Sequence, residues 1–224
     1  MKNKKIEGIK TIIWDCDNTI WIHRKDEANI IAKHFGIAEV EKLGKQFSEM
    51  IKQFNKFFED KKVVRWKIEK IIEVYMPILE KYEIKPAVFL KEWLRIETSF
   101  LNDDALEAIK YLDAKGYENI VLTDWLWDAQ IMLLKKYGVL PYIKKIYTCD
   151  DMYLKRNPKT KTRIIEEGKE EQYIIVGDSL ESDIAFANAA GIRSIWFNPG
   201  YKTNDTPNKP TYEISSMLEL CKMC

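Results

Sequence analysis

The chain has 224 residues, enough for one large domain or two small ones with a core that needs no disulfides. It carries 36 Lys and Arg against 35 Asp and Glu, and this formal charge of +1 argues against a general nucleic-acid-binding protein. No apolar run approaches the roughly 18 residues of a membrane span, and residues 1–11 lack the apolar stretch of a signal peptide. We therefore expect a soluble, cytoplasmic protein whose partners are neither nucleic acid nor membrane. The sequence leaves the oligomeric state open.

Short apolar runs rich in β-branched residues predict buried parallel strands. Helical patterns that end at a glycine lie between these runs and predict helices over 103–115, 127–137 and 182–190. This alternation is typical of an α/β domain, a Rossmann-like parallel sheet flanked by helices. The strands that we expect are 11–14, 119–123 and 172–176, with weaker candidates at 145–148 and 193–197.

The segment 24–99 has a different pattern, because its apolar residues are spaced as in helices throughout. Pro77 and Pro86 are expected to break the pattern, giving three or four helices in a small bundle. This all-helical module follows the first strand and precedes the next α/β unit. We therefore expect an α/β core domain of residues 1–23 and 100–224, with a helical domain of residues 24–99 inserted in it.

Polar residues follow three of the predicted strands. In open α/β sheets ligands bind beyond the carboxyl ends of the strands, so these residues should meet at one edge of the sheet. The first strand is followed by Asp15 and Asp17, the second by Thr123 and Asp124, and the third by Asp178 and Asp183. Any one of these residues alone could simply form a turn or cap a helix.

A cluster of four of these aspartates requires protons or a cation, because like charges repel strongly in a poorly solvated cleft. The four are Asp15, Asp17, Asp178 and Asp183. A small number of oxygen ligands suits Mg²⁺, which is commonly coordinated by both protein and substrate phosphate oxygens. Asp15 leaves its strand first and is the candidate nucleophile, and Asp17 is the candidate acid and base. The Thr123 hydroxyl, turn N–H groups at Asp124 and the Lys155 ammonium are the candidate phosphate-binding groups.

These motifs resemble those of the haloacid dehalogenase superfamily of phosphohydrolases. The family's D-x-D-x-T motif corresponds to residues 15–19, and its hydrophobic strand ending in Thr or Ser corresponds to residues 120–123. Lys155 with Pro158 resembles the third motif, and G-D-S-x-x-x-D stands at residues 177–183. The position and helical character of residues 24–99 match this family's mobile cap.

The resemblance implies a role for each of these residues. Asp15 would be the nucleophile and a Mg²⁺ ligand, and Asp17 would be the acid and base, with its backbone carbonyl also reaching the metal. Asp178 would bind Mg²⁺, and Asp183 would do so directly or through water. The chain departs from the motifs at Asn18, where Gly is usual, and at Arg156, where Pro is usual. The latter leaves Lys159 as an alternative third-motif lysine.

The resulting expectation is a Mg²⁺-dependent phosphomonoester hydrolase that acts on a small phosphorylated metabolite through an aspartyl phosphate. By resemblance, Asp17 favours phosphate chemistry, because haloacid dehalogenases lack an Asp at that position. A phosphomutase of the same superfamily and a non-catalytic phosphate-binding or scaffold protein remain as alternatives.

Several further residues have two interpretations. Tryptophans near the motifs could line a substrate pocket or belong to the core; these are Trp21, Trp125 and Trp127. A basic cluster between helices of the inserted module could attract an anionic substrate or form a solvated turn; it comprises Lys61, Lys62, Arg65 and Lys67. The C-x-x-C pair Cys221 and Cys224 ends the chain, where we expect two reduced thiols.

Overall fold

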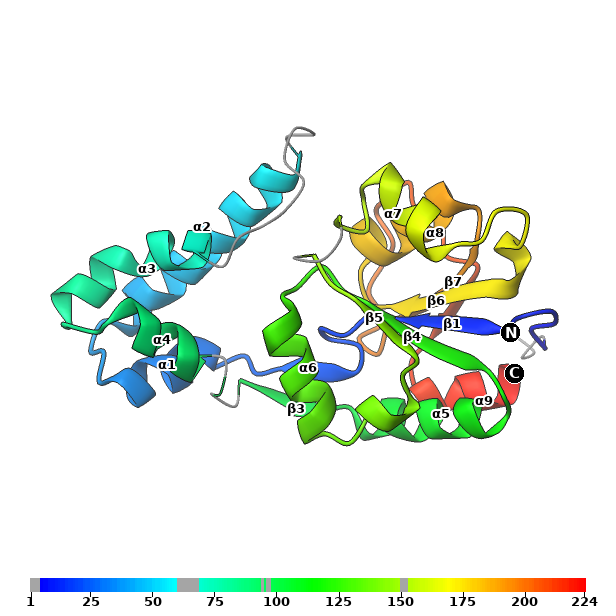
Figure 1. Cartoon of the computed structure of the whole chain (residues 1–224), viewed down its shortest axis with the longest axis horizontal. Coiled ribbons are helices and arrows are strands. Elements are labelled where there is room, and N and C mark those ends of the chain that lie inside the picture. The colour runs from blue at the N-terminus through cyan, green and yellow to red at the C-terminus, as the bar shows by residue number, and fades with distance from the viewer. Residues whose placement is uncertain (1–4, 60–68, 94, 96–97, 150–152) are drawn as a thin grey trace. The chain divides into compact units, whose positions relative to one another are not determined.

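The computed structural model describes residues 5–59, 69–93, 95, 98–149 and 153–224 (Figure 1). The chain divides into two compact units, one made of residues 1–22 and 101–224 and the other of residues 23–100. The basic cluster of residues 61–67 lies outside the described residues.

The larger unit contains a six-stranded parallel sheet in the order β5-β4-β1-β6-β7-β8. β1 is central and fully buried, with Trp14 opposite Val121 on one side and Val176 on the other. Apolar runs without polar alternation form such strands because both faces of the sheet are covered. The strands are β1 (Thr11–Trp14), β4 (Glu118–Leu122), β5 (Lys145–Tyr147), β6 (Tyr173–Gly177), β7 (Arg193–Phe197) and β8 (Tyr212–Ile214).

Helices cover the two faces of this sheet, with α5 and α9 on one face and α7 and α8 on the other (Figure 1). Neighbouring residues of β1 point to opposite faces: Ile12 and Trp14 join one core cluster, and Ile13 joins the other. The fold class expected from the sequence, an α/β Rossmann-like sheet flanked by helices, is confirmed. The helices are α5 (Asp103–Ala114), α6 (Trp127–Lys136), α7 (Pro158–Ile164), α8 (Ala185–Ala190) and α9 (Leu220–Met223).

The expected helix over 182–190 is only partly an α-helix. Residues 180–184 form a wide, π-helical turn, and α8 begins at Ala185. Ser179 precedes this turn, and its hydroxyl accepts a hydrogen bond from the Ser182 N–H at 3.1 Å. The wider turn matters because it contains Asp183.

Residues 23–100 contain four helices among the described residues. Their shared core is aromatic and aliphatic, with Phe89 against Tyr75 at a ring-centroid distance of 5.0 Å and stacked on Trp93 at 6.3 Å. The helices are α1 (Glu27–Phe35), α2 (Val40–Glu59), α3 (Glu69–Lys81) and α4 (Pro86–Trp93).

The expectation that Pro77 breaks a helix is wrong, because Pro77 lies inside α3. Proline removes one backbone donor and crowds the preceding turn, which disfavours a helix interior. The next two residues, Ile78 and Leu79, are fully buried, so apolar packing of α3 outweighs this local effect. Pro86 does mark a boundary, since it is the first residue of α4.

The chain passes between the units through two short strands, β2 (Trp21–His23) and β3 (Ser99–Leu101), which form their own two-stranded sheet. The Asn102 N–H donates to the Ile20 carbonyl at 2.9 Å, and the Arg24 N–H donates to the Thr98 carbonyl at 2.7 Å. These bonds show that the strands run in opposite directions. The exit and return of the chain are therefore adjacent.

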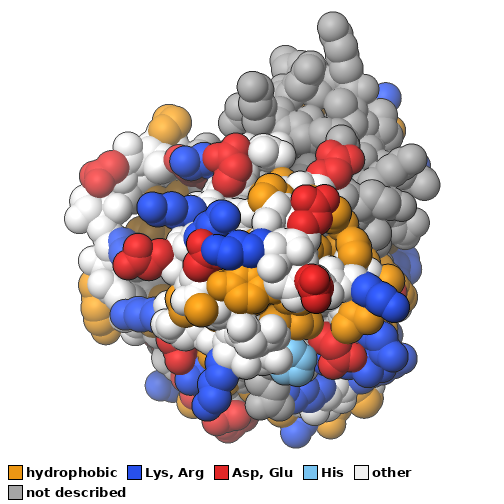
Figure 2. Space-filling model, turned by 90° about the vertical axis from the view of Figure 1, so that its left-hand side faces the viewer, with side chains coloured by type: hydrophobic (Ala, Val, Ile, Leu, Met, Phe, Trp, Pro, Cys, Tyr) orange, Lys and Arg blue, Asp and Glu red, His pale blue; other side chains and the backbone are white. Residues whose placement is uncertain are grey.

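The surface carries both signs of charge. On the face drawn in Figure 2, Lys and Arg side chains are interspersed with Asp and Glu side chains, as the near-neutral composition suggests. Among the described residues, none of the helices combines the length and the apolar character needed to cross a membrane.

Candidate active site at the carboxyl edge of the sheet

The ends of β1, β4 and β6 lie at one edge of the sheet, and the candidate residues follow them. The Asp15 N–H continues the ladder by donating to the Val176 carbonyl at 2.9 Å, and the Thr123 N–H donates to the Tyr147 carbonyl at 3.0 Å. The loops after these strands are thereby aligned by the register of the sheet. Parallel strands place chemistry-bearing loops at this edge in α/β folds.

Asp15 is buried and held from both carboxylate oxygens. Its Oδ2 accepts a hydrogen bond from the Thr19 hydroxyl at 3.0 Å, and its Oδ1 forms an ion pair with Lys155 Nζ. Burial raises the pKa of the Asp15 carboxyl, the Lys155 ammonium opposes this, and the neighbouring Asp17 adds to it. The side chain is therefore fixed in one orientation by contacts to both of its oxygens.

Lys155 is the cation of the cluster and is itself only 3% exposed. Its Nζ bridges Asp15 and Asp183, donating to Asp183 Oδ1 at 2.7 Å. Burial lowers the pKa of the Lys155 ammonium, but the carboxylates of Asp15, Asp183 and Asp124 outweigh burial and hold it well above its usual value. Lys159 lies instead on α7, with its ammonium over the Tyr153 ring at 5.5 Å.

Three carboxylates lie close enough to share a metal ion. Asp15, Asp178 and Asp183 each offer an oxygen, and these oxygens all lie within 4.8 Å of one another. Burial, followed by the Asp15 charge, raises the pKa of the Asp178 carboxyl to about 7. When all three carboxylates are ionised, they and the Lys155 ammonium together carry two negative charges, and hard oxygen ligands suit Mg²⁺. The donor set therefore fits a divalent cation in both charge and ligand type.

Asp17 is half-buried and lies in a separate hydrogen-bond network. The Trp21 indole N–H donates to its Oδ1 at 3.1 Å, and the Gln130 side-chain amide donates to its Oδ2 at 2.8 Å. The Thr123 hydroxyl lies 3.5 Å from the same Oδ2. Trp21 is fully buried, so this tryptophan belongs to the core and orients Asp17 instead of lining a pocket.

Asp124 links three loops. Its Oδ1 accepts a hydrogen bond from the Lys155 N–H at 2.7 Å, and its Oδ2 accepts one from the Ser182 hydroxyl at 2.8 Å. A carboxylate repels a phosphate, so any phosphate contact of Asp124 would come from its backbone N–H. The side chain instead fixes the loop that carries Lys155.

Gly177 is required by the closeness of Asp183. A Cβ at Gly177 would lie 2.2 Å from the Asp183 carboxyl carbon and from its Oδ2. The same Oδ2 accepts a hydrogen bond from the Ser179 N–H at 3.0 Å. The wide turn over 180–184 thus folds Asp183 back against the end of β6, which only glycine permits.

Two features explain the departures from the motifs. Asn18, where Gly is usual, has a φ of +60°, in the left-handed region that Asn enters more readily than most other residues. The Asn157 side chain accepts a hydrogen bond from the Lys159 N–H at 2.9 Å and caps α7, whose first residue is Pro158. The loop after Lys155 is therefore anchored without the missing proline.

Two residues at this edge were not expected from the sequence. Gln130 lies in α6 and touches both Asp17 and Thr123, and the Trp196 indole N–H donates to the Asp178 carbonyl oxygen at 2.9 Å. Trp125 is half-buried and its backbone N–H donates to the Thr123 hydroxyl at 3.2 Å, whereas Trp127 is 39% exposed. The amphipathic pattern of α6 gives Gln130 no signal, since glutamine is an ordinary helix residue.

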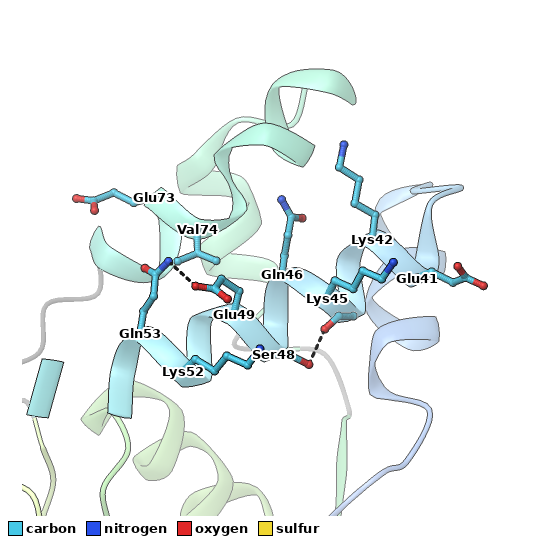
Figure 3. A pocket seen from close by; sticks show the side chains of 11 residues that line it. Glu41, Lys42, Lys45, Gln46, Ser48, Glu49, Lys52, Gln53, Glu73 and Val74 are labelled. Carbon is cyan, nitrogen blue, oxygen red and sulfur yellow. Dashed lines mark hydrogen bonds between the residues drawn. The ribbon is translucent and has the colours of Figure 1, made fainter. Parts of the chain in front are cut away.

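Two other candidate regions contain none of the cluster residues. A hollow of about 840 Å³ on α2 and α3 is lined by outward-pointing side chains of both charges (Figure 3). Within it the Gln53 amide donates a hydrogen bond to Glu49, and the Ser48 hydroxyl donates one to the Gly44 carbonyl. Both hydrogen bonds join residues of the same helix, α2. Cys221 and Cys224 form no disulfide and lie partly buried beside the core, with α9 holding the chain end in place.

The fold and its polar edge define an α/β enzyme domain interrupted by a helical unit. The family model of haloacid dehalogenase-like hydrolases matches residues 9–191, and the chain belongs to this family. The resemblance drawn from the four motifs is thereby confirmed, and so is the expectation of an enzyme of this hydrolase family.

Individual relatives cover almost the whole chain at low identity. The HAD hydrolase YfnB of Bacillus subtilis is 26% identical over 223 residues, covering 94% of this chain and 93% of its own. The pyrimidine 5′-nucleotidase PynA of Streptococcus pneumoniae is 25% identical over 226 residues, with the same coverage.

Solved structures share the fold at still lower identity. A magnesium-bound structure of YfnB superposes with a TM-score of 0.69 at 21% identity, covering 96% of this chain and 97% of that one. A 2-haloacid dehalogenase of Pseudomonas syringae gives 0.71 at 20% identity, with coverage of 96% and 97%. A HAD hydrolase and a dehalogenase therefore share this architecture, and the side chains of the site must distinguish their activities.

Proposed function

We propose that the protein is a Mg²⁺-dependent phosphomonoester hydrolase that works through an aspartyl phosphate on Asp15. The observation that carries this proposal is the pairing of Asp15 with the buried ammonium of Lys155, next to a second carboxylate, Asp17, that has its own donors. One carboxylate is thus fixed for attack, and the other is held apart for proton transfer.

In the first half-reaction an Asp15 oxygen attacks phosphorus and the bond from phosphorus to the ester oxygen breaks. Protonated Asp17 gives its proton to that leaving oxygen, so an alcohol departs and Asp15 carries the phosphoryl group. Lys155 and the Thr123 hydroxyl, with the Asp124 N–H, bind the oxygens of the transferred group. The rigid hold on Asp15 keeps the attacking oxygen near the phosphorus.

In the second half-reaction Asp17, now ionised, takes a proton from water as the water oxygen attacks phosphorus. The bond between Asp15 and phosphorus breaks, inorganic phosphate leaves, and both aspartates return to their starting protonation states. Mg²⁺ bound by Asp15, Asp178, Asp183 and the Asp17 backbone carbonyl would neutralise charge on the phosphoryl oxygens.

The substrate proposed is a small phosphorylated metabolite. PynA is named as a pyrimidine 5′-nucleotidase, so one relative that matches 94% of this chain acts on an organic phosphate. We assign residues 24–99 to a cap that selects the leaving group, while residues 1–23 and 100–224 perform the chemistry. We propose the cytoplasm as the site of action.

The test is hydrolysis of p-nitrophenyl phosphate with Mg²⁺, with a chelator, and by an Asp15→Asn variant. We expect activity to require Mg²⁺ and to fall about 10⁴-fold or more in Asp15→Asn, the scale on which loss of a nucleophile acts. Asp205→Asn, at an exposed aspartate, is the matched control and should retain activity.

Two outcomes would replace the proposal. Transfer of phosphate to another hydroxyl of a sugar phosphate, without release of inorganic phosphate, would indicate a phosphomutase. Absence of hydrolysis across a panel of phosphorylated metabolites, together with no binding of BeF₃⁻, would indicate a non-catalytic protein.

A further inference from the structure

Gln130 is a fully buried amide in α6 that contacts the candidate acid and base. Its Nε2 donates to Asp17 Oδ2 at 2.8 Å and lies 3.1 Å from the Thr123 hydroxyl oxygen. The backbone N–H of Gln130 bonds to the Leu126 carbonyl in the first turn of α6, so the side chain projects from a fixed point.

This amide is a poor choice for stability alone. Its Oε1 is buried, and no hydrogen-bond donor within the described parts of the chain reaches it. A buried polar atom without a partner destabilises the folded state, and an apolar side chain of similar volume would avoid that penalty. The group of the amide that makes a favourable contact is therefore the Nε2 N–H, which donates to Asp17.

Asp17 is held from two sides by two different elements. Trp21 at the start of β2 donates to Oδ1, and Gln130 in α6 donates to Oδ2. One donor alone would allow the carboxylate to turn about its axis, whereas two donors on different oxygens fix its plane. The Thr123 hydroxyl is a third and longer contact, 3.5 Å from Oδ2.

We infer that Gln130 is a positioning residue that fixes the plane of the Asp17 carboxyl for proton transfer to the leaving oxygen. The inference rests on the proposed function, in which Asp17 is the acid. Gln130 itself exchanges no proton and forms no bond with substrate. Its contribution is to keep the transferable proton of Asp17 directed at the ester oxygen while the bond to phosphorus breaks.

The experiment compares two substrates whose leaving groups differ in how much they require protonation by a general acid. An alkyl phosphate releases a strongly basic alkoxide that requires a proton, whereas 2,4-dinitrophenyl phosphate releases a stable phenolate that does not. For Gln130→Met we expect kcat/KM on methyl phosphate to fall about 10²-fold, as for loss of an effective general acid, with a change within about threefold on 2,4-dinitrophenyl phosphate. Thermal unfolding should show no loss of stability.

Three further variants make the comparison specific. Gln130→Asn keeps an amide but shortens its reach, so it should show the same selective loss on methyl phosphate. This variant also tests the inference where Gln130→Met does not fold. Trp21→Phe removes the other donor and should lose activity in the same selective pattern. Asn119→Leu removes a buried amide that bonds Trp14 and the Ile109 carbonyl, away from Asp17, and should lower stability without changing leaving-group selectivity.

The outcomes separate the inference from the function on which it rests. A wild-type enzyme that hydrolyses both esters, with Gln130 variants that lose activity equally on both or on neither, overturns the positioning role and leaves the proposed function intact. A wild-type protein that hydrolyses neither these esters nor the panel of phosphorylated metabolites, and does not bind BeF₃⁻, overturns the proposed function and the inference together.

Discussion

The two units of this protein bury different kinds of residue. The unit of residues 1–22 and 101–224 buries ionised and polar side chains in its core, including Asp15, Lys155 and Asp183. In the described parts of residues 23–100, the buried side chains are hydrophobic except for Ser99. A buried charge requires exact partners, whereas apolar packing requires volume. Substitutions should therefore change chemistry in the first unit and stability in the second.

The largest expected effect tests the apolar core of the helical unit. Phe89→Ala removes a fully buried ring that contacts Tyr75 and Trp93, and should lower the free energy of unfolding by about 3–5 kcal/mol. Val88→Ala, next to it but 48% exposed, is the matched control and should stay within about 0.5 kcal/mol. Denaturant unfolding measures both, and equal effects would contradict the difference in burial.

A glycine in the α/β unit tests the sensitivity of its charged cluster. Gly177→Ala places a Cβ 2.2 Å from the Asp183 carboxyl group and must displace it. We expect the Mg²⁺ affinity to fall about 10–100-fold, with activity falling alongside it, as when a group that orients a metal ligand is lost. Titration with Mg²⁺ measures the change. An unaltered affinity would show that Mg²⁺ binding by Asp183 does not require its carboxyl group to lie this close to residue 177.

The third prediction concerns pH. Because burial and Asp15 raise the Asp178 pKa to about 7, the metal-free protein at pH 6 holds a proton that Mg²⁺ must displace. Affinity for Mg²⁺ should rise with pH by about tenfold per unit below that pKa. The folded metal-free state also binds this proton more tightly than the unfolded chain does, so its stability should fall as pH rises from about 4 to 7. Titration calorimetry at pH 6, 7 and 8 measures the Mg²⁺ affinity. In the Asp178→Asn variant this affinity should no longer depend on pH in this range.

The smallest effect is expected at a glycine of the helical unit. Gly44 lies inside α2, where an added Cβ would meet the Ala28 Cβ at an ordinary 3.7 Å. Gly44→Ala should raise the free energy of unfolding by about 0.5–1 kcal/mol, because alanine loses less backbone freedom in a helix. Thermal unfolding measures it. A destabilising result would mean that α1 and α2 pack more closely there than this spacing indicates.

The fold was predictable because its signals are local. Apolar runs such as 11–14 and 193–197 became strands with little change of boundary, since burial on both faces demands continuous hydrophobicity. β8 was missed because Tyr212–Ile214 is short and has the charged Glu213 at its centre. The expectation at Pro77 was wrong because the burial of Ile78 and Leu79 stabilises α3 through tertiary packing, which helix propensities do not include.

The candidate site was predictable only in part. Asp15, Asp17 and Asp178 follow strands directly, so the parallel sheet alone brings them to one edge. Gln130 and Trp196 reach the same edge through side chains that start seven residues beyond Thr123 or on another strand, and their types are common elsewhere in proteins. The bonds of Asp124 to Lys155 and Ser182 depend on loop conformation, which the spacing of motifs does not describe.

The pairing of β2 with β3 has a consequence for how the gene could be rearranged. Adjacent strands lie about 4.8 Å apart, so the two ends of the inserted segment meet without any help from the helices between them. A short hairpin turn could join Arg24 to Thr98, which are hydrogen-bonded, and a foreign segment could take the place of residues 25–97 at little loop-closure entropy, with β2 and β3 retained. The junction is thus a natural point for exchanging one insert for another while the parallel sheet keeps its register.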